Sequence, residues 1–415
     1  MKIHYYMQYF PGADAAGSRQ PFAFSRFLAD CGHDVTVVAC NRNIDTGARE
    51  KVFDANCDNG GSLKILRLPC LPGGRGSNAA RLCAYNSFMA AAFVRGALLP
   101  RPDVILGSIQ PLFAGLAALA VAKLKKTPFV LEVRDLWPDA LVVKKAITPA
   151  QAWPLFVLTN FLYRQASRIV SITPGIRKEL LKKGVSASRI DVFPNGFDPQ
   201  LFLNTTGLRE QVRSSYGWGS NFVAMYVGSF TKVTALDVVV RAAARLKDTG
   251  IRFELFGSGP AHGQVQHLAE DIGATNVTFH DPVPKVQVPG LLAAADIALM
   301  SLFKTPLAHI YFENKFMDYM GAGKAIMAAM EGEQADMIRR YDLGRVVAPG
   351  DDLGLSQLVR QASLSGKNVQ AMGLRGKALV DERLLLPAIL QRYGAVLEAA
   401  AAGTLESYPV WEPSP

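Results

Sequence analysis

The chain has 415 residues and a formal net charge of +10, with 49% hydrophobic and 19% charged residues. This length exceeds what one hydrophobic core organises, and the composition excludes a disordered chain, so we expect two globular domains. The longest apolar run, from Leu112 to Ala122, is too short to cross a membrane, and Lys2 to Met7 lacks the apolar region of a signal peptide. We therefore expect a cytoplasmic protein.

The positive charge is concentrated in one half of the chain. Residues 1–200 hold 25 Lys and Arg against 14 Asp and Glu, whereas residues 201–415 hold 20 against 21. A basic half indicates an anionic partner, such as phospholipid headgroups, a lipid diphosphate or nucleic acid, unless the charge serves solubility alone. We do not expect nucleic acid, because the basic residues are not interleaved with aromatic residues as in base-stacking surfaces.

The cysteines predict neither disulfides nor a metal site. Their number is odd, no Cys-x-x-Cys spacing occurs, and small buried hydrophobic residues are the simplest interpretation. They are Cys31, Cys40, Cys57, Cys70 and Cys83.

Short apolar runs alternate with helical patterns in the first half, which predicts a parallel sheet covered by helices. The expected strands are Ile3–Met7, Val35–Ala39, Val104–Leu106, Phe129–Val133 and Ile169–Ile172, and the expected helices include Pro21–Asp30, Leu112–Leu124 and Ile176–Lys183. The turn cluster from Pro194 to Pro199 is the best domain boundary.

The second half repeats this alternation. The expected strands are Phe222–Val227, Phe253–Phe256, Val277–Phe279, Ile297–Met300 and Ala325–Ala328. The expected helices are about Ala235–Leu246, Val265–Ile272, Pro284–Ala294, Asn314–Ala322 and Asp336–Tyr341, followed by an Ala- and Leu-rich helix from about Leu384 to Ala402. Ligands of such sheets bind outside the carboxyl ends of the strands, so the loops there are the candidate sites.

The run from Tyr311 to Lys324 is the most informative segment. Its apolar residues recur at helical spacing, and Gly321 and Gly323 end the pattern. Lys315 lies in the first turn, where the helix dipole disfavours a cation, so we expect an anion such as a diphosphate at the same helix start. Asp318 lies three residues further on and can face the same ligand, as the ribose of a nucleotide would require.

This segment resembles the donor-binding helix of family 4 glycosyltransferases, and most closely that of the bacterial branch that builds surface polysaccharides. Further motifs in the family's order extend the resemblance over nearly the whole chain: Gln8 to Pro11, Gly17 to Arg19, Arg134 to Asp139, Pro194 to Asp198, Tyr226 to Phe230 and Gly257 to Pro260. The resemblance implies the GT-B fold, an α/β architecture of two Rossmann-like domains facing each other across a cleft. It divides the chain into a basic acceptor-binding domain (1–198), a nucleotide-sugar-binding domain (199–383), and a helix that crosses back to the first domain with a loose tail (384–415).

The resemblance implies a donor site on several loops. Its candidate residues are Gly17, Gly228, Ser229, Lys232, Gly257, Asn314, Lys315 and Asp318. Family members often carry an Arg where Ser229 stands and Lys-Gly where Thr234-Ala235 stands, which leaves Lys232 and Lys315 as the expected cations.

One departure concerns the family's pair of acids, which are spaced eight residues apart. Asp318 matches the second acid, expected to bind ribose, but the first position is Ile310. Glu313 or His309 is the candidate replacement, and Glu313 is one of two candidate catalytic residues.

The second catalytic candidate is Asp135, on the loop after the strand that ends at Val133. Arg134 and Trp137 on the same loop are candidates for acceptor binding, through an acceptor phosphate and a sugar face; Arg134 could instead pair with Asp139. Gly12 and Arg19, after the first strand, complete the acceptor candidates.

These residues lead to one expectation and two alternatives. We expect a retaining glycosyltransferase that moves a sugar from a nucleotide diphosphate sugar to a polyprenyl-diphosphate-linked saccharide. We expect no cofactor or metal, because the departing diphosphate can take the acceptor proton if cations stabilise its charge, and no Asp-x-Asp occurs. A nucleotide-sugar 2-epimerase of the same fold and a non-catalytic GT-B subunit are the alternatives.

Four arginines of the first half indicate a surface that could contact a membrane. Arg75, Arg81, Arg95 and Arg101 flank a helix-like stretch rich in Ala, Phe, Met and Leu. Such a basic amphipathic surface suits peripheral contact with an anionic membrane, and a solvated helix edge explains it equally well.

Overall fold

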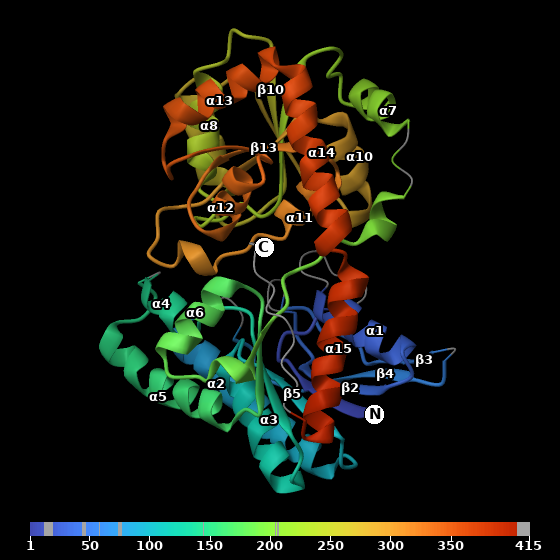
Figure 1. Ribbon diagram of the computed structural model, residues 1–415. Coiled ribbons are helices and arrows are strands. Elements are labelled where there is room, and N and C mark those ends of the chain that lie inside the picture. Colours follow the sequence, from blue (N-terminus) through green and yellow to red (C-terminus); the bar gives the residue numbers. More distant parts are fainter. Residues whose placement is uncertain are drawn as a thin grey trace. The chain divides into compact units, whose positions relative to one another are not determined.

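The computed structural model describes residues 1–11, 20–43, 47–57, 59–73, 77–143, 145–203, 205 and 207–404. The chain forms two compact units: Met1–Pro194 with Pro387–Pro415, and Asn195–Leu386. Each unit is built around its own, largely parallel sheet with helices packed on it (Figure 1). The expected α/β architecture of two parallel-sheet domains is therefore confirmed.

The first unit contains an eight-stranded sheet in the order β3-β4-β2-β1-β5-β6-β7-β8. All neighbouring strands are parallel except β3 and β4. Every residue of β5 and β6 is buried, as expected for central strands covered on both faces. The strands are β1 (Lys2–Tyr6), β2 (Asp34–Cys40), β3 (Phe53–Asn56), β4 (Ser62–Leu68), β5 (Val104–Ser108), β6 (Phe129–Val133), β7 (Arg168–Ser171) and β8 (Ile190–Val192).

Helices pack on the sheet of the first unit, and α3 contacts both α2 and α5. A capping box formed by Thr148 and Gln151 begins α5. The helices are α1 (Gln20–Asp30), α2 (Asn78–Leu98), α3 (Leu112–Lys125), α4 (Asp139–Val143), α5 (Pro149–Gln165), α6 (Pro174–Lys182), the short η1 (Ala187–Arg189) and α15 (Leu386–Ala402).

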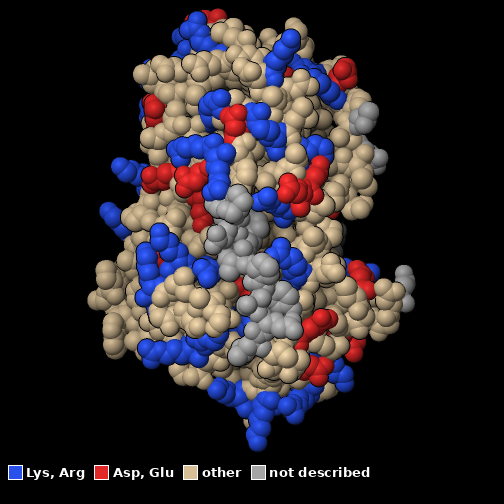
Figure 2. Space-filling model, in the orientation of Figure 1, with Lys and Arg blue, Asp and Glu red and all other residues tan. Residues whose placement is uncertain are grey.

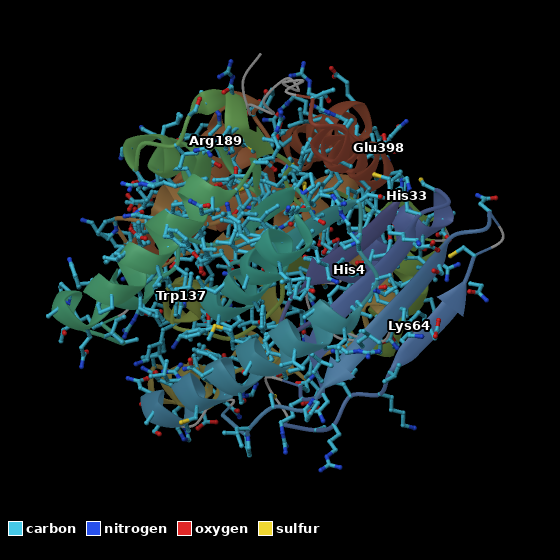
Figure 3. The ribbon with its side chains drawn as sticks, turned by 90° about the horizontal axis from the view of Figure 1, so that it is seen from below. His4, His33, Lys64, Trp137, Arg189 and Glu398 are labelled. Carbon is cyan, nitrogen blue, oxygen red and sulfur yellow. The ribbon has the colours of Figure 1, made fainter. Side chains whose placement is uncertain are left out.

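The C-terminal helix α15 packs within the first unit. The ring of Tyr393 stacks on Phe24 at a centroid distance of 3.9 Å and on Phe193 at 5.3 Å. Further along the helix, Glu398 lies 3.4 Å from the ring of His33 (Figure 3). Residues from the far end of the chain therefore complete the core of the first unit.

The second unit contains a six-stranded parallel sheet in the order β11-β10-β9-β12-β13-β14. The strands are β9 (Phe222–Val227), β10 (Ile251–Phe256), β11 (Val277–His280), β12 (Ile297–Ser301), β13 (Ala325–Ala329) and β14 (Gly344–Val347). The helices are α7 (Leu208–Ser215), α8 (Leu236–Ala244), α9 (His262–Asp271), α10 (Val288–Ala294), α11 (Lys315–Gly321), α12 (Glu333–Arg340), α13 (Asp352–Leu364) and α14 (Gly366–Arg383), with the short η2 (Pro199–Phe202), η3 (Lys285–Gln287) and η4 (Ala308–Ile310).

Every strand predicted from the sequence is present, but β3, β4, β8 and β14 were missed. The missed strands lie at or next to sheet edges, where polar residues interrupt the apolar pattern: β4 reads Ser-Leu-Lys-Ile-Leu-Arg-Leu and β8 has only three residues. In the second half α7, α13 and α14 were also missed, and α14 carries three glycines that lower its helix propensity. The helix expected over Pro284–Ala294 is the short η3 followed by α10.

Candidate functional site

Two glycine loops lie at the carboxyl end of the sheet in the second unit, where α/β sheets bind ligands. β9 ends at Val227 and β10 at Phe256, and the loops that follow are hydrogen-bonded to each other. The Gly228 N–H donates to the Phe256 carbonyl at 2.9 Å, and the Phe230 N–H donates to the Ser258 carbonyl at 2.9 Å. The backbone of both loops is therefore fixed before any ligand arrives.

Gly257 is required by this backbone packing. Its φ is +146°, and a Cβ there would lie 1.9 Å from the Gly228 carbonyl oxygen, closer than any side chain tolerates. The glycine predicted from the resemblance thus has a structural reason of its own, which is the close approach of two loops.

Lys315 lies beside the first of these loops and is largely buried, with 10% of its side chain exposed. Its Nζ is 2.5 Å from Glu313 Oε2 and 4.9 Å from the ring centroid of Tyr226. A Cβ on Gly228 would lie 2.6 Å from Lys315 Cε, so Gly228 makes room for this side chain. The loop, the aromatic ring and the carboxylate together hold one ammonium group at the strand end.

The charge of Lys315 is secured by its surroundings. Burial opposes the protonated form, but the carboxylate of Glu313 and the hydroxyls of Tyr226 and Tyr319 outweigh it, so the pKa of Lys315 is raised above its usual value. The ammonium therefore stays protonated at neutral pH. An anion was expected at this helix start, and Glu313 supplies one from the protein itself.

The helix that carries Lys315 is shorter than predicted: α11 spans Lys315–Gly321, whereas Asn314–Ala322 was expected. A hydrogen bond fixes α11 against the end of β9: the hydroxyl of Tyr319 accepts from the Val227 N–H at 2.9 Å. Asn314 precedes the helix without a side-chain capping bond to its N–H groups; its side-chain oxygen instead accepts a hydrogen bond from Asn195.

Asp318 forms an ion pair with Lys285 of η3, a residue that the sequence analysis did not single out. Burial raises the pKa of Asp318, and the charge of Lys285 works against this rise. The two residues are 33 positions apart, so helical periodicity contains no signal for their contact. The available signal was the place of Lys285 in the segment after the expected strand Val277–Phe279, since the segments that follow strands are the candidate sites.

Gln334 of α12, also missed, fixes the backbone of Glu313. The Glu313 N–H donates to Gln334 Oε1 at 3.0 Å, and Gln334 Nε2 donates to the Glu313 carbonyl at 2.9 Å. Gln334 is fully buried, so this pair of bonds is shielded from water. His309, the other candidate for the missing acid, lies in η4, and Ile310 at the family's acid position is buried.

Ser229 and Lys232 are exposed in the segment between β9 and α8. The segment is held by Thr234, whose hydroxyl donates to the carbonyls of Ser229 and Thr231 at 3.2 and 2.9 Å. Among the described residues no hydrogen bond or ion pair fixes the Lys232 ammonium. The two predicted cations therefore differ, since Lys315 is held in place and Lys232 is presented to solvent.

In the first unit a buried carboxylate lies at the end of β6. Glu132 accepts a hydrogen bond from the Tyr5 hydroxyl at 2.6 Å and from the Tyr393 hydroxyl at 3.2 Å. Arg134 Nη1 is 3.6 Å from the same carboxylate, and Arg134 Nη2 donates to Gln20 Oε1 at 2.8 Å. A buried carboxylate needs such partners, because an unpaired one is costly.

This arrangement corrects one pairing considered from the sequence. Arg134 pairs with Glu132, whereas Asp139 accepts from Lys183 at 3.0 Å. Asp135 and Trp137 are half-buried on the same loop, and the Trp137 carbonyl accepts from the Thr159 hydroxyl at 3.4 Å (Figure 3). The structure thus brings Arg134, Asp135 and Trp137 together at the end of β6, while Gly12, Gly17 and Arg19 lie outside the described residues.

The described residues contain neither a cluster of metal ligands nor a helix suited to span a membrane. No three His, Cys, Asp or Glu side chains in this part of the chain are arranged as metal ligands. No helix in it combines the length and apolar character needed to cross a bilayer.

Family models match both halves of the chain. The model described as "Glycosyl transferase 4-like domain" matches residues 23–196, and the model "Glycosyl transferases group 1" matches residues 221–363. The chain is also 23% identical over 248 residues to WcaI of Escherichia coli, described as a putative colanic acid biosynthesis glycosyl transferase. That match covers 58% of this chain and 61% of WcaI, so it spans less than two thirds of the relative.

Solved structures share the fold over nearly the whole chain. Sucrose-phosphate synthase from Thermosynechococcus elongatus superposes with a TM-score of 0.79 at 18% identity, covering 97% of this chain and all of that one. HepE of Anabaena, solved in complex with UDP-glucose, gives a TM-score of 0.72 at 16% identity, with 96% of this chain and all of that chain covered. These structural similarities show the GT-B fold, and the two domain matches identify the chain as a member of the family 4 glycosyltransferases.

Proposed function

We propose that this protein transfers a sugar from a nucleotide diphosphate sugar to an acceptor hydroxyl, with retention of the anomeric configuration. The observation that carries the proposal is Lys315, a largely buried ammonium held by Glu313 and Tyr226 beside the glycine loop after β9. A fixed cation at a strand end of an α/β sheet suits the diphosphate of a nucleotide sugar.

In the proposed reaction the bond between the anomeric carbon and the diphosphate oxygen breaks, and a bond to the acceptor oxygen forms on the same face. The acceptor proton passes to an oxygen of the departing diphosphate, so no protein base is needed. Lys315 stabilises the charge that develops on this diphosphate, and removal of such a preorganised donor typically costs about 10²–10³ in rate. This route needs no metal.

The acids of the second unit take supporting roles in this proposal. Glu313 orients Lys315 and keeps it protonated. Asp318 binds the ribose hydroxyls, and Lys285 favours the charged carboxylate, which is the better acceptor for hydroxyl protons.

We assign the acceptor to the loop after β6 in the first unit. Trp137 offers a ring for a sugar face, and Arg134 and Asp135 offer a cation and a carboxylate for acceptor phosphate and hydroxyl groups. The basic composition of residues 1–200 favours an anionic acceptor such as a polyprenyl-diphosphate-linked saccharide, at the inner face of the cytoplasmic membrane. The colanic acid role attributed to WcaI is in line with surface polysaccharide synthesis.

The test is turnover of a panel of UDP-, GDP- and dTDP-sugars, with and without a polyprenyl-diphosphate saccharide in detergent, repeated in EDTA. We expect acceptor-dependent release of nucleotide diphosphate that survives EDTA and is lost in Lys315→Met. Since HepE was solved with UDP-glucose, UDP-sugars are the first donors to try. The anomeric configuration of the product, determined by NMR, tests retention directly.

Two outcomes would replace the proposal. Epimerised donor without acceptor would identify a nucleotide-sugar 2-epimerase. Donor binding without turnover on any acceptor would identify a binding subunit, for which the missing acid at Ile310 would be the reason.

A further inference from the structure

Helix α5 exposes an apolar stripe that nothing described in the protein covers. Trp153, Val157 and Phe161 are spaced four residues apart and therefore lie on one side of the helix. All three are exposed, Trp153 to 67%. The opposite side, with Ala152, Thr159 and Leu162, is buried against the unit. A helix of a soluble monomer normally carries polar residues on its solvent-facing side, whereas α5 carries apolar residues there.

Helix α2 repeats this feature. Phe93, Val94 and Leu98 are exposed along its last two turns, Leu98 to 74%. Helix α3 contacts both α2 and α5, so the three helices form one layer. Large exposed apolar side chains on neighbouring elements mark an interaction surface more strongly than scattered single residues do.

The charges of this layer have one sign. The sequences of α2, α3 and α5 contain no Asp or Glu, while Arg95, Lys123 and Arg164 are exposed. Figure 2 shows Lys and Arg side chains gathered at the lower end of the first unit, the end near which α3 is labelled in Figure 1. The partner of this surface must therefore accept apolar side chains and supply negative charge.

We propose that the outer faces of α2 and α5 form a docking surface for an anionic lipid bilayer. Trp153, Phe161 and Leu98 insert at the level of the headgroups, where Trp is favoured, and the three cations bind lipid phosphates. A second copy of this chain fits less well, since pairing the surface with itself would set cations against cations without acids to balance them. The docking surface would bring a lipid-linked acceptor to the first unit. The proposal of this surface does not depend on whether the protein catalyses the transfer reaction.

The experiment is flotation of the full chain with vesicles of phosphatidylethanolamine and phosphatidylglycerol, compared with pure phosphatidylcholine. We expect binding to the anionic vesicles that weakens with salt. Substitution of the stripe (Trp153→Ser, Val157→Ser, Phe161→Ser) should lower the partition coefficient at least tenfold. Substitution of the cations (Arg95→Gln, Lys123→Gln, Arg164→Gln) should lower it about fivefold for each charge removed at low salt, and have little effect at high salt.

A matched control replaces two exposed leucines of the second unit, Leu364→Ser and Leu374→Ser, and should bind as the wild type does. Brominated lipids should quench the emission of wild-type protein, and this quenching should fall in Trp153→Phe although binding persists. Unchanged thermal unfolding and nucleotide binding would show that the stripe variants are folded and separate this test from that of transfer.

Three results would overturn the proposal. The first is absence of flotation at low salt, and the second is flotation that the stripe variant retains. The third is a wild-type dimer in solution that the stripe substitutions convert to a monomer, which would assign the face to a second copy of the chain.

Discussion

The Tyr393 hydroxyl donates to Glu132 Oε1 at 3.2 Å, which joins the C-terminal helix to the end of β6 over 261 positions of sequence. The same carboxylate faces Arg134, so the helix supports the loop that carries the acceptor candidates. Burial and the charge of Glu132 raise the pKa of Tyr393 far above its usual value, so the hydroxyl remains a donor at any physiological pH.

The first prediction tests this hydrogen bond. Tyr393→Phe should lower the free energy of unfolding by about 1–3 kcal/mol, because a buried carboxylate loses one of its donors. The measurement is urea unfolding followed by circular dichroism. Tyr163→Phe is the matched control: its hydroxyl is buried and has no hydrogen-bond partner in the described structure, so its removal should be neutral or stabilising. Equal effects of the two substitutions would contradict the assigned role.

The second prediction concerns the close approach of the two glycine loops. Gly257→Ala should destabilise the protein by about 2–4 kcal/mol, because the new Cβ meets a carbonyl oxygen at 1.9 Å and the φ of +146° is unfavourable for alanine. Gly263→Ala in α9 has open space around its Cβ and should stabilise by about 0.5–1 kcal/mol. The measurement is the thermal unfolding of both variants compared with the wild type. A Gly257→Ala protein as stable as the wild type would show that the two loops can separate.

The third prediction compares the two lysines of the proposed donor site. Lys315→Met should weaken binding of a nucleoside diphosphate about 10- to 100-fold and leave binding of the nucleoside nearly unchanged, since the ammonium is proposed to bind the diphosphate and not the nucleoside. Lys232→Met should have a smaller effect, because this exposed side chain must be ordered on binding. Titration calorimetry with UDP and uridine measures both. A larger loss for Lys232→Met would move the main phosphate contact to that residue.

The fourth prediction concerns pH and His4, which lies within β1 (Figure 3). Burial, and then the charge of Lys125, lower the pKa of His4 from 6.5 to about 4. Between pH 4 and pH 6.5, His4 is therefore protonated in the unfolded chain but neutral in the folded chain. The stability that the neutral His4 contributes is fully present above pH 6.5 and is lost as the pH falls toward 4. The total loss should be about 3 kcal/mol.

His4→Phe removes this titration and keeps the ring volume. Between pH 7 and pH 4, the wild type should therefore lose about 3 kcal/mol more of its unfolding free energy than His4→Phe does. Urea unfolding at half-unit steps of pH provides the measurement. A difference that stays constant over this range would rule out His4 as the titrating group.

The strongly apolar strands were predictable because each carries its own signal. β5, β6 and β9 each begin with at least three consecutive apolar residues, and short apolar runs bounded by turn residues are typical of buried strands. β3 and β14 carry no such signal, since they are short edge strands in which polar residues or a glycine interrupt the apolar pattern.

The candidate site divides in the same way. Lys315, Asp318 and the glycine loops follow from short-range features, namely a helical spacing and a strand followed by glycine. Lys285 beside Asp318, Gln334 beside Glu313 and Tyr393 beside Glu132 do not, because each partner is 21 or more positions away. The apolar outer faces of α2 and α5 were equally hidden, since periodicity shows that a helix has an apolar side but not whether a neighbour covers it.

The sequence by itself therefore determined the two parallel-sheet units, the family, and the strand ends at which a nucleotide sugar is proposed to bind. Only the tertiary structure decided which charges are paired, which cation is fixed and which apolar face is left uncovered. The physical reason is range: secondary structure and glycine turns are set by neighbours along the chain, whereas burial and electrostatic partners are set by residues that folding brings together.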